Sequence, residues 1–196
     1  MRFVIGSLGI LAAAPLSAQA TGRLSAGVTS SSSIIVDDIL NTRLRPALAP
    51  TITAAFSIPT GKGPYRATVE ASYSRSALNV TDGDSIHDQL ASVGTATTEL
   101  LIEGPIRGEL HWQAGGGMIF YLPSERQGIF QDDGTHRWIV AGGLLLTHPL
   151  TATMNLTVTG RVDTHNFTTE VLQARDFGIA QAVQRVALLV GVSRRF

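Results

Sequence analysis

Hydrophobic and polar residues alternate along most of this chain with a period of two. The stretch from Ala152 to Asp163 alternates throughout. In Tyr65 to Tyr73, one side carries Tyr, Ala, Val, Ala and Tyr, and the other carries Arg, Thr, Glu and Ser. Such a pattern places successive side chains on opposite faces of a β-strand, whereas convincing helical stripes are almost absent. The sequence therefore predicts an all-β protein.

Most of the strands that this pattern predicts are longer than the five or six residues of an ordinary globular strand. About ten tilted residues are enough for a strand to cross the hydrocarbon layer of a membrane. The predicted strands cover residues 22–31, 47–58, 65–75, 90–103, 108–121, 137–147, 151–163 and 183–196.

The predicted connections alternate between short and long, as they do in an up-and-down barrel with its short turns at one end. We therefore predict a closed antiparallel up-and-down eight-stranded transmembrane β-barrel with four long outer loops. The short turns are 59–64, 103–107 and 147–150, each with Gly or Pro, and the long loops are 32–46, 76–89, 122–136 and 164–182.

The beginning of the chain has the pattern of a cleavable export signal. Arg2 is followed by an apolar stretch, and the small residues Ser17-Ala18-Gln19-Ala20 resemble a cleavage site. We expect residues 1–20 to be a signal peptide and residues 21–196 to form the barrel domain.

The composition narrows the chemistry of the exported domain. The chain has no cysteine, which excludes disulfides and thiolate metal sites, and no cofactor is expected. The 15 basic residues balance the 15 acidic residues and form no basic stripe, so nucleic acid is not an expected partner.

The last segment alternates apolar and other residues and ends in an aromatic residue. With the export signal, the strand lengths and the alternating loops, it resembles small eight-stranded bacterial outer-membrane β-barrel proteins, the OmpA/OmpX-like class. This resemblance implies insertion into outer-membrane lipid and recognition by the barrel assembly machinery. Arg194 stands where such families more often have an aromatic residue. The residues matching the C-terminal assembly signal are Val186, Leu188, Val190, Val192 and Phe196.

If the apolar rows face lipid, the opposite rows face the interior of the barrel. An eight-stranded barrel is only wide enough for its own side chains, so charges inside it must pair. The predicted polar network of the interior consists of Arg66, Glu70, Glu99, His111, Arg161, Asp163, Arg185 and Arg195.

No catalytic motif is recognisable, and we expect a non-enzymatic barrel that presents its loops for surface contact or contributes to envelope integrity. Asp163 and His165, with Asp37-Asp38, are the residue types of an omptin-like surface protease. Ser124 and His136 offer the residue types for an enzyme acting on lipid A. A narrow channel and a soluble periplasmic lipocalin-like barrel are further alternatives. The sequence does not identify a surface ligand.

Several predicted loops contain apolar residues: Ile34 to Val36, Ile129-Phe130, and Val171-Leu172 with Phe177. Exposed apolar side chains often mark contact surfaces. We favour the alternative that they pack on one another and cap the barrel. The acidic run Asp82 to Asp88 lacks the ligand spacing of an EF-hand and is expected to be a polar loop tip.

Overall fold

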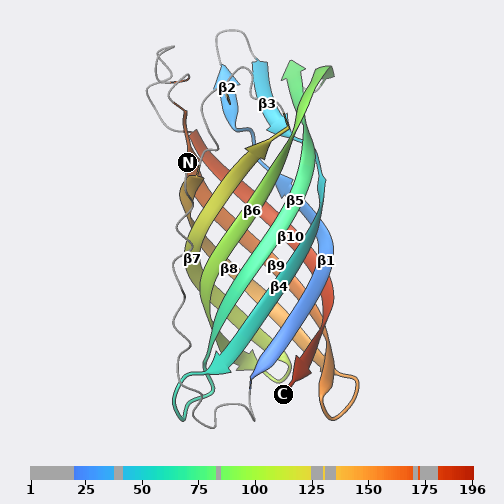
Figure 1. Cartoon of the computed structure of the whole chain (residues 1–196), viewed down its shortest axis with the longest axis vertical. Helices are drawn as coiled ribbons and strands as arrows, with labels where there is room; N and C mark the ends of the chain where they lie inside the picture. The colour runs from blue at the N-terminus through green and yellow to red at the C-terminus, as the bar shows by residue number, and fades with distance from the viewer. Residues whose placement is uncertain are drawn as a thin grey trace, which may run out of the picture.

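The strands close into a single barrel (Figure 1). The computed structural model describes residues 20–37, 42–82, 85–124, 130, 136–169, 172 and 181–196. Eight long strands form the closed ring in this part of the chain, and a short hairpin, β2–β3, adds to β5. The strands are β1 (Thr21–Ser31), β2 (Ile35–Asp37), β3 (Thr42–Pro46), β4 (Ala49–Pro59), β5 (Arg66–Asp82), β6 (Ser85–Arg107), β7 (Leu110–Pro123), β8 (His136–Pro149), β9 (Met154–Phe167) and β10 (Gln181–Arg195).

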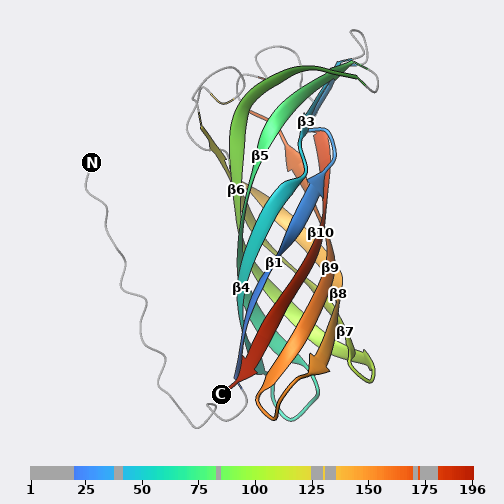
Figure 2. The same cartoon turned by 90° about the vertical axis from the view of Figure 1, so that its right-hand side faces the viewer.

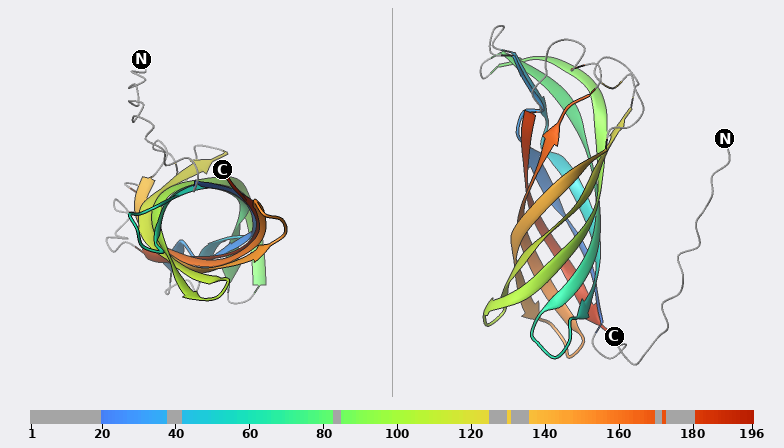
Figure 3. Two further views of the ribbon diagram at one scale, coloured as in Figure 1. Left: turned by 90° about the horizontal axis from the view of Figure 1, so that it is seen from below. Right: turned by 90° about the vertical axis from the view of Figure 1, so that its left-hand side faces the viewer.

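Every pairing in the ring is antiparallel, and β1 pairs with β10 to join the two ends of the sequence order. Thr21 lies opposite Arg195, and Ser31 lies opposite Arg185. Seen along its axis, the barrel is a closed ring of strands (Figure 3). Because the ring of strands is closed, it has no open edge with unpaired backbone N–H and C=O groups. A β-structure in lipid needs this closure, since lipid offers these groups no hydrogen-bond partner. The predicted fold class is confirmed.

Both described ends of the barrel, Thr21 and Phe196, lie at the same end of the barrel (Figure 2). We call this the turn end, because three short turns, residues 60–65, 108–109 and 150–153, also lie there. Gly61 and Gly108 adopt φ values of +66° and +56° in two of these turns, a conformation that favours glycine. The opposite end is called the loop end.

Two of the turns lie further along the chain than predicted. β6 continues through the predicted turn 103–107, and β8 continues to Pro149 instead of ending at residue 147. Gly104 lies within β6 and not in a turn. A Cβ at this position would lie 2.6 Å from the indole of Trp112, its neighbour on β7. The glycine that suggested a turn therefore makes room for a tryptophan.

At the loop end, the second predicted loop, 76–89, is mostly strand. β5 runs to Asp82 and β6 begins at Ser85, and both rise past the other strands and curve across this end (Figure 2). Register shifts in the β5–β6 pair, the first at Ala77/Leu78, accompany this curvature. Alternation fades here because polar side chains such as Arg75 and Asn79 occupy the outward positions, so the sequence pattern reads as loop.

The outward face of the barrel carries a continuous apolar band. Along β10 and to Phe196 just beyond its end, exposed apolar residues run from Val186 to Phe196, which is about 33 Å at ~3.3 Å per residue. At a tilt of about 40° this corresponds to roughly 25 Å of height, the thickness of the lipid-facing band of outer-membrane barrels. Trp138, 77% exposed, lies towards the loop end of the band, and Tyr65 lies at the turn end. No helix among the described residues is long and apolar enough to cross a membrane.

Candidate functional site

The middle of the barrel interior holds a layer of paired charges. Glu70 is at its centre: its Oε2 accepts a hydrogen bond from Arg23 Nη2 at 3.0 Å, and its Oε1 accepts one from Arg161 Nη1. All three side chains are almost fully buried. We call this group, with the residues that continue it, the charged layer. A buried carboxylate held by two guanidinium groups is the kind of pairing that makes charges tolerable away from water.

The charged layer extends from Glu70 in two directions. On one side, Arg23 Nη1 lies 3.2 Å from Glu103 Oε1, which also accepts a hydrogen bond from Gln113 Nε2 at 2.7 Å. On the other side, Arg161 Nη2 lies 3.2 Å from Glu99 Oε1, which accepts from Thr97 Oγ1 at 2.9 Å. The contacts link side chains from five strands, so they tie together parts of the chain that are distant in sequence.

The pairing of the strands, and the glycines opposite the charged residues, explain how the side chains of the charged layer fit together. Glu70 and Glu99 are direct neighbours on β5 and β6, which would place two negative charges side by side. Arg161 reaches across from β9 and pairs with both. Glycines make the room: Gly117 lies opposite Glu99, where a Cβ would overlap the carbonyl oxygen of Thr98, and Gly143 lies opposite Arg161. The mid-strand glycines therefore serve close packing.

A second ionic pair and a hydrogen bond continue the interior towards the loop end. Asp163 Oδ1 lies 3.7 Å from Arg185 Nη1, and both side chains are buried. Beyond them, Tyr121 Oη and His165 Nε2 are 2.6 Å apart. Several buried polar atoms here have no protein partner among the described residues, including Glu99 Oε2, Arg161 Nε and His165 Nδ1. Such atoms are the usual sites of ordered internal water.

Above these polar groups, the interior becomes apolar. Phe167, fully buried, packs edge-on against Tyr121 with ring centroids 5.0 Å apart, and Phe130 lies 6.0 Å from Phe167. We call this cluster the apolar cap. It contains Ile34, Leu44, Leu78, Val93, Ile119, Tyr121, Phe130, Ile139, Phe167, Leu172 and Val183, with Ile35 and Val80 packed against it.

The apolar cap accounts for the loop residues that the sequence analysis singled out. Ile34, Phe130 and Leu172 are all buried in it, as expected for loops that pack on one another. Ile129, Val171 and Phe177 lie outside the described residues. Because the cap closes the loop end and the charged layer fills the middle, the described interior is obstructed twice in series.

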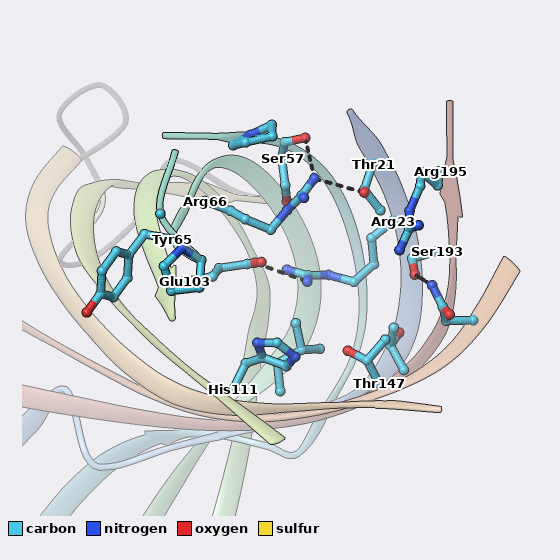
Figure 4. Close-up of a pocket in the computed structure, with 16 residues that line it drawn as sticks. Thr21, Arg23, Ser57, Tyr65, Arg66, Glu103, His111, Thr147, Ser193 and Arg195 are labelled. Atoms are coloured by element: carbon cyan, nitrogen blue, oxygen red, sulfur yellow. Dashed lines mark hydrogen bonds and ion pairs between the residues drawn. The ribbon is translucent and has the colours of Figure 1, made fainter. Parts of the chain in front are cut away.

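Below the charged layer, a cavity of about 320 Å³ opens at the turn end (Figure 4). We call it the vestibule. Arg66, His111 and Arg195, which the sequence analysis placed in one network with the acids, line this cavity together with Arg23 and Glu103. Arg66 Nη2 donates to Thr21 Oγ1 at 2.9 Å and to the Ser57 carbonyl oxygen at 3.1 Å. The structure thus separates the eight predicted network residues into an upper buried set and a set at the turn end.

Two members of the charged layer, Arg23 and Glu103, were not predicted from the sequence. Glu103 was assigned to a turn because Gly104 and Pro105 follow it, and Arg23 was not singled out in the first strand. The signal for both was available: each is a charged residue at an inward position of an alternating strand. Continuing the alternation from Glu99 to residue 103 would have placed Glu103 inside the barrel.

The described residues considered for catalysis, Asp163, His165, Ser124 and His136, are not assembled into a catalytic site. Asp163 is buried beside Arg185, and His165 is buried against Tyr121, so neither faces a substrate at the surface. Asp38 lies outside the described residues. His136 lies beside Phe120, with ring centroids 6.3 Å apart, and the Ser124 backbone N–H donates to the Ser92 carbonyl oxygen at 2.9 Å. In the described part of the chain, no group of three or more His, Asp or Glu side chains could hold a metal ion.

The residues of the predicted C-terminal assembly signal lie on the outward face of β10 and just beyond it. The four aliphatic residues and Phe196 are all exposed, at 43–59%. Arg194 is also outward, with its guanidinium carbon 5.8 Å from the centroid of the Phe196 ring. A long arginine side chain can follow an apolar surface and keep its charge at the boundary with water. The signal residues are Val186, Leu188, Val190, Val192 and Phe196.

Comparison with solved structures identifies the type of barrel. The chain is similar to Neisserial surface protein A, with 12% identity over 90% of this chain and 97% of that chain, and a TM-score of 0.52. It is also similar to the outer membrane protein OprG from Pseudomonas aeruginosa, with 14% identity over 91% and 96% of the two chains and a TM-score of 0.53. No protein-family model and no curated protein matches the sequence. The chain therefore has the fold of small outer-membrane β-barrels.

Proposed function

We propose that this protein is an integral outer-membrane barrel with a closed interior, which acts without catalysis and presents its loop end at the cell surface. The turn end faces the periplasm in this proposal, and the loop end faces outward. The observation that carries it is the combination of an apolar outward band with a doubly obstructed interior. Export by the signal peptide at residues 1–20, and recognition of the C-terminal strand by the barrel assembly machinery, are part of the same proposal.

The distribution of polarity supports a membrane location over a soluble barrel. A lipocalin-like barrel has a polar exterior and an apolar ligand site inside it. Here the exterior is apolar over roughly 25 Å, and the middle of the interior is ionic. An apolar exterior around a polar interior is the reverse of the lipocalin arrangement, and it is the one that lipid favours.

The surface that this barrel offers is a small sheet beyond the apolar band. β2, β3 and the ends of β5 and β6 form it, and β3 pairs with β5 from Thr42 opposite Asp82 to Pro46 opposite Leu78. Arg43, Arg45 and Arg75 are exposed on these strands. Their hydrogen bonds, such as that from Arg45 Nε to the Ser31 carbonyl oxygen at 3.0 Å, help to fix the sheet on the barrel. A projection with exposed arginines suits contact with other molecules at the cell surface.

The location and the orientation are tested with single cysteines, which the chain permits because it has none of its own. Arg43→Cys reports on the loop end and Lys62→Cys on the turn end. A membrane-impermeant maleimide added to whole cells should label Arg43→Cys and leave Lys62→Cys unlabelled until the outer membrane is opened. Labelling of Lys62→Cys alone would reverse the orientation. Recovery of the protein in the soluble periplasmic fraction would reject the membrane location.

The closed interior is tested in planar lipid bilayers. The purified protein, checked for faster gel migration before boiling than after, should show no steady unitary conductance. The apolar cap and the charged layer both stand in the path of ions. A reproducible conductance from the folded protein would replace this proposal with the narrow channel.

A further inference from the structure

The vestibule at the turn end has an excess of positive charge. Arg23, Arg66 and Arg195 line it, and Glu103 is the carboxylate among its lining residues. Oε1 of that carboxylate accepts from Arg23 at 3.2 Å and from Gln113 at 2.7 Å, and the same carboxylate attracts Arg66, so one acid is shared by two of the three arginines. The cavity therefore carries more cation than its own acid balances.

Arg195 is the distinctive member of this group. It is exposed and lines the cavity (Figure 4), and within the described residues its guanidinium has no hydrogen-bond or ion-pair partner. The Arg66 guanidinium is attracted by Glu103 and, less strongly, repelled by the like charge of Arg195. Two guanidinium groups directed into one cavity are an unfavourable arrangement by themselves and a favourable one around an anion.

From this geometry we infer that the vestibule is a binding site for a small phosphate- or carboxylate-bearing anion, entered from the turn end. The cavity of about 320 Å³ is at the lower end of the range of small-molecule sites. Arg195 and Arg66 supply planar donor groups that match phosphate or carboxylate oxygens, and His111 can add a ring N–H. The charged layer closes the cavity from above, so the anion is held and not passed through the barrel.

The same chemistry could reach the site as a free anion or as the phosphate of a lipid headgroup at the rim. The test therefore uses inorganic phosphate as the probe and varies the lipid. The protein is titrated calorimetrically with phosphate at low ionic strength, first in nanodiscs of neutral lipid and then in nanodiscs that contain an anionic phospholipid. Equal phosphate binding in both assigns the site to a free anion. Loss of phosphate binding only in the anionic nanodiscs assigns it to the lipid phosphate.

Two neighbouring arginines provide a matched pair of variants. Arg195→Gln removes one of the three arginines that line the vestibule, and Arg194→Gln removes an equal charge from the outward face, beside Phe196. Arg195→Gln should weaken phosphate binding at least about tenfold, the loss expected for one charge-assisted contact. Arg194→Gln should leave the affinity within about twofold, since its charge is screened and outside the cavity.

Folding of both variants is checked by gel migration before and after boiling. In the unsubstituted protein, the Arg195 Nε–H resonance should shift during the phosphate titration, which gives a readout that needs no variant. The inference is wrong if phosphate does not saturate the protein in either type of nanodisc. It is also wrong if the two variants weaken binding equally, because net charge alone would then explain the effect.

Discussion

The charged layer and the apolar cap fill the same barrel, surrounded by the same eight strands, yet they are held together by different physics. The charged layer depends on specific partners: Glu70 needs both Arg23 and Arg161, at positions fixed by three different strands. The apolar cap depends on filled volume, with rings and aliphatic chains in contact from strands and from the loop end. The first is sensitive to the loss of one partner, whereas the second is sensitive to the loss of volume.

The two layers also contribute differently to the specificity of the fold. A shift of one residue in strand register moves every inward side chain to the outside. In the charged layer, that shift would place Glu70 or Arg161 against lipid, which is very costly. In the cap, it would only exchange apolar inward residues for other side chains. We therefore expect the charged layer to fix the register of the barrel and the cap to close it.

Replacing Arg161 with methionine should give the largest effect, because it tests the dependence on partners directly. Methionine fills much of the same volume but leaves the adjacent carboxylates Glu70 and Glu99 without their shared cation. We expect a loss of about 3–5 kcal/mol in the free energy of unfolding, the usual cost of breaking a buried ionic pair. Urea titration of the protein folded in lipid vesicles measures it.

The matched control for this change is Arg75→Met. Arg75 is exposed and contacts Ser92 Oγ at 2.9 Å, so its loss should cost less than about 1 kcal/mol. If Arg161→Met were as mild as this control, the charged layer would be tolerating two adjacent carboxylates of which only Glu70 keeps an arginine partner, Arg23. The difference drawn between the two layers would then be unfounded.

Much of the barrel could be predicted from the sequence, because alternation is a local property. The phase of each strand follows from its own residues: Gln113 and Arg161 are inside, whereas Leu188 and Val190 are outside. The partners of the charged layer could not be predicted in this way. Which acid meets Arg161 depends on the tilt and stagger of strands that are far apart in sequence. That is why Arg66 and Arg195, which line the vestibule, were grouped with Glu70, Glu99 and Asp163, which lie further along the interior.

The loop end was less predictable for a physical reason. Outside the apolar band, both faces of a strand can be polar, so β5 and β6 lose their alternation although their backbone ladder continues. The hairpin of β2 and β3 is held by pairing with β5, a contact between residues that lie more than thirty positions apart. Local patterns carry no information about such pairing.

Replacing Tyr121 with phenylalanine tests the boundary between the two layers. Tyr121 packs in the apolar cap, but its hydroxyl pairs with His165 Nε2 at 2.6 Å. Phenylalanine keeps the ring and leaves His165 without that partner, so we expect a loss of about 1–3 kcal/mol in the free energy of unfolding. Tyr73→Phe, on the exposed outward face, should change it by no more than about 0.5 kcal/mol. Equal effects from the two changes would mean that the buried hydrogen bond between Tyr121 and His165 adds nothing to the free energy of unfolding.

Replacing Ile119 with leucine should have the smallest effect in the interior and therefore makes the contrast sharpest. Ile119 is fully buried in the cap, and leucine has the same volume with a different shape. Neighbouring rings and aliphatic chains can repack around it, so we expect a loss below about 1.5 kcal/mol, whereas Ile119→Ala should cost about 2–5 kcal/mol by leaving a cavity. The same urea titration compares both with Arg161→Met, which also largely conserves volume. If Ile119→Leu cost as much as Arg161→Met, the cap would depend on exact shape as strongly as the charged layer depends on its partners.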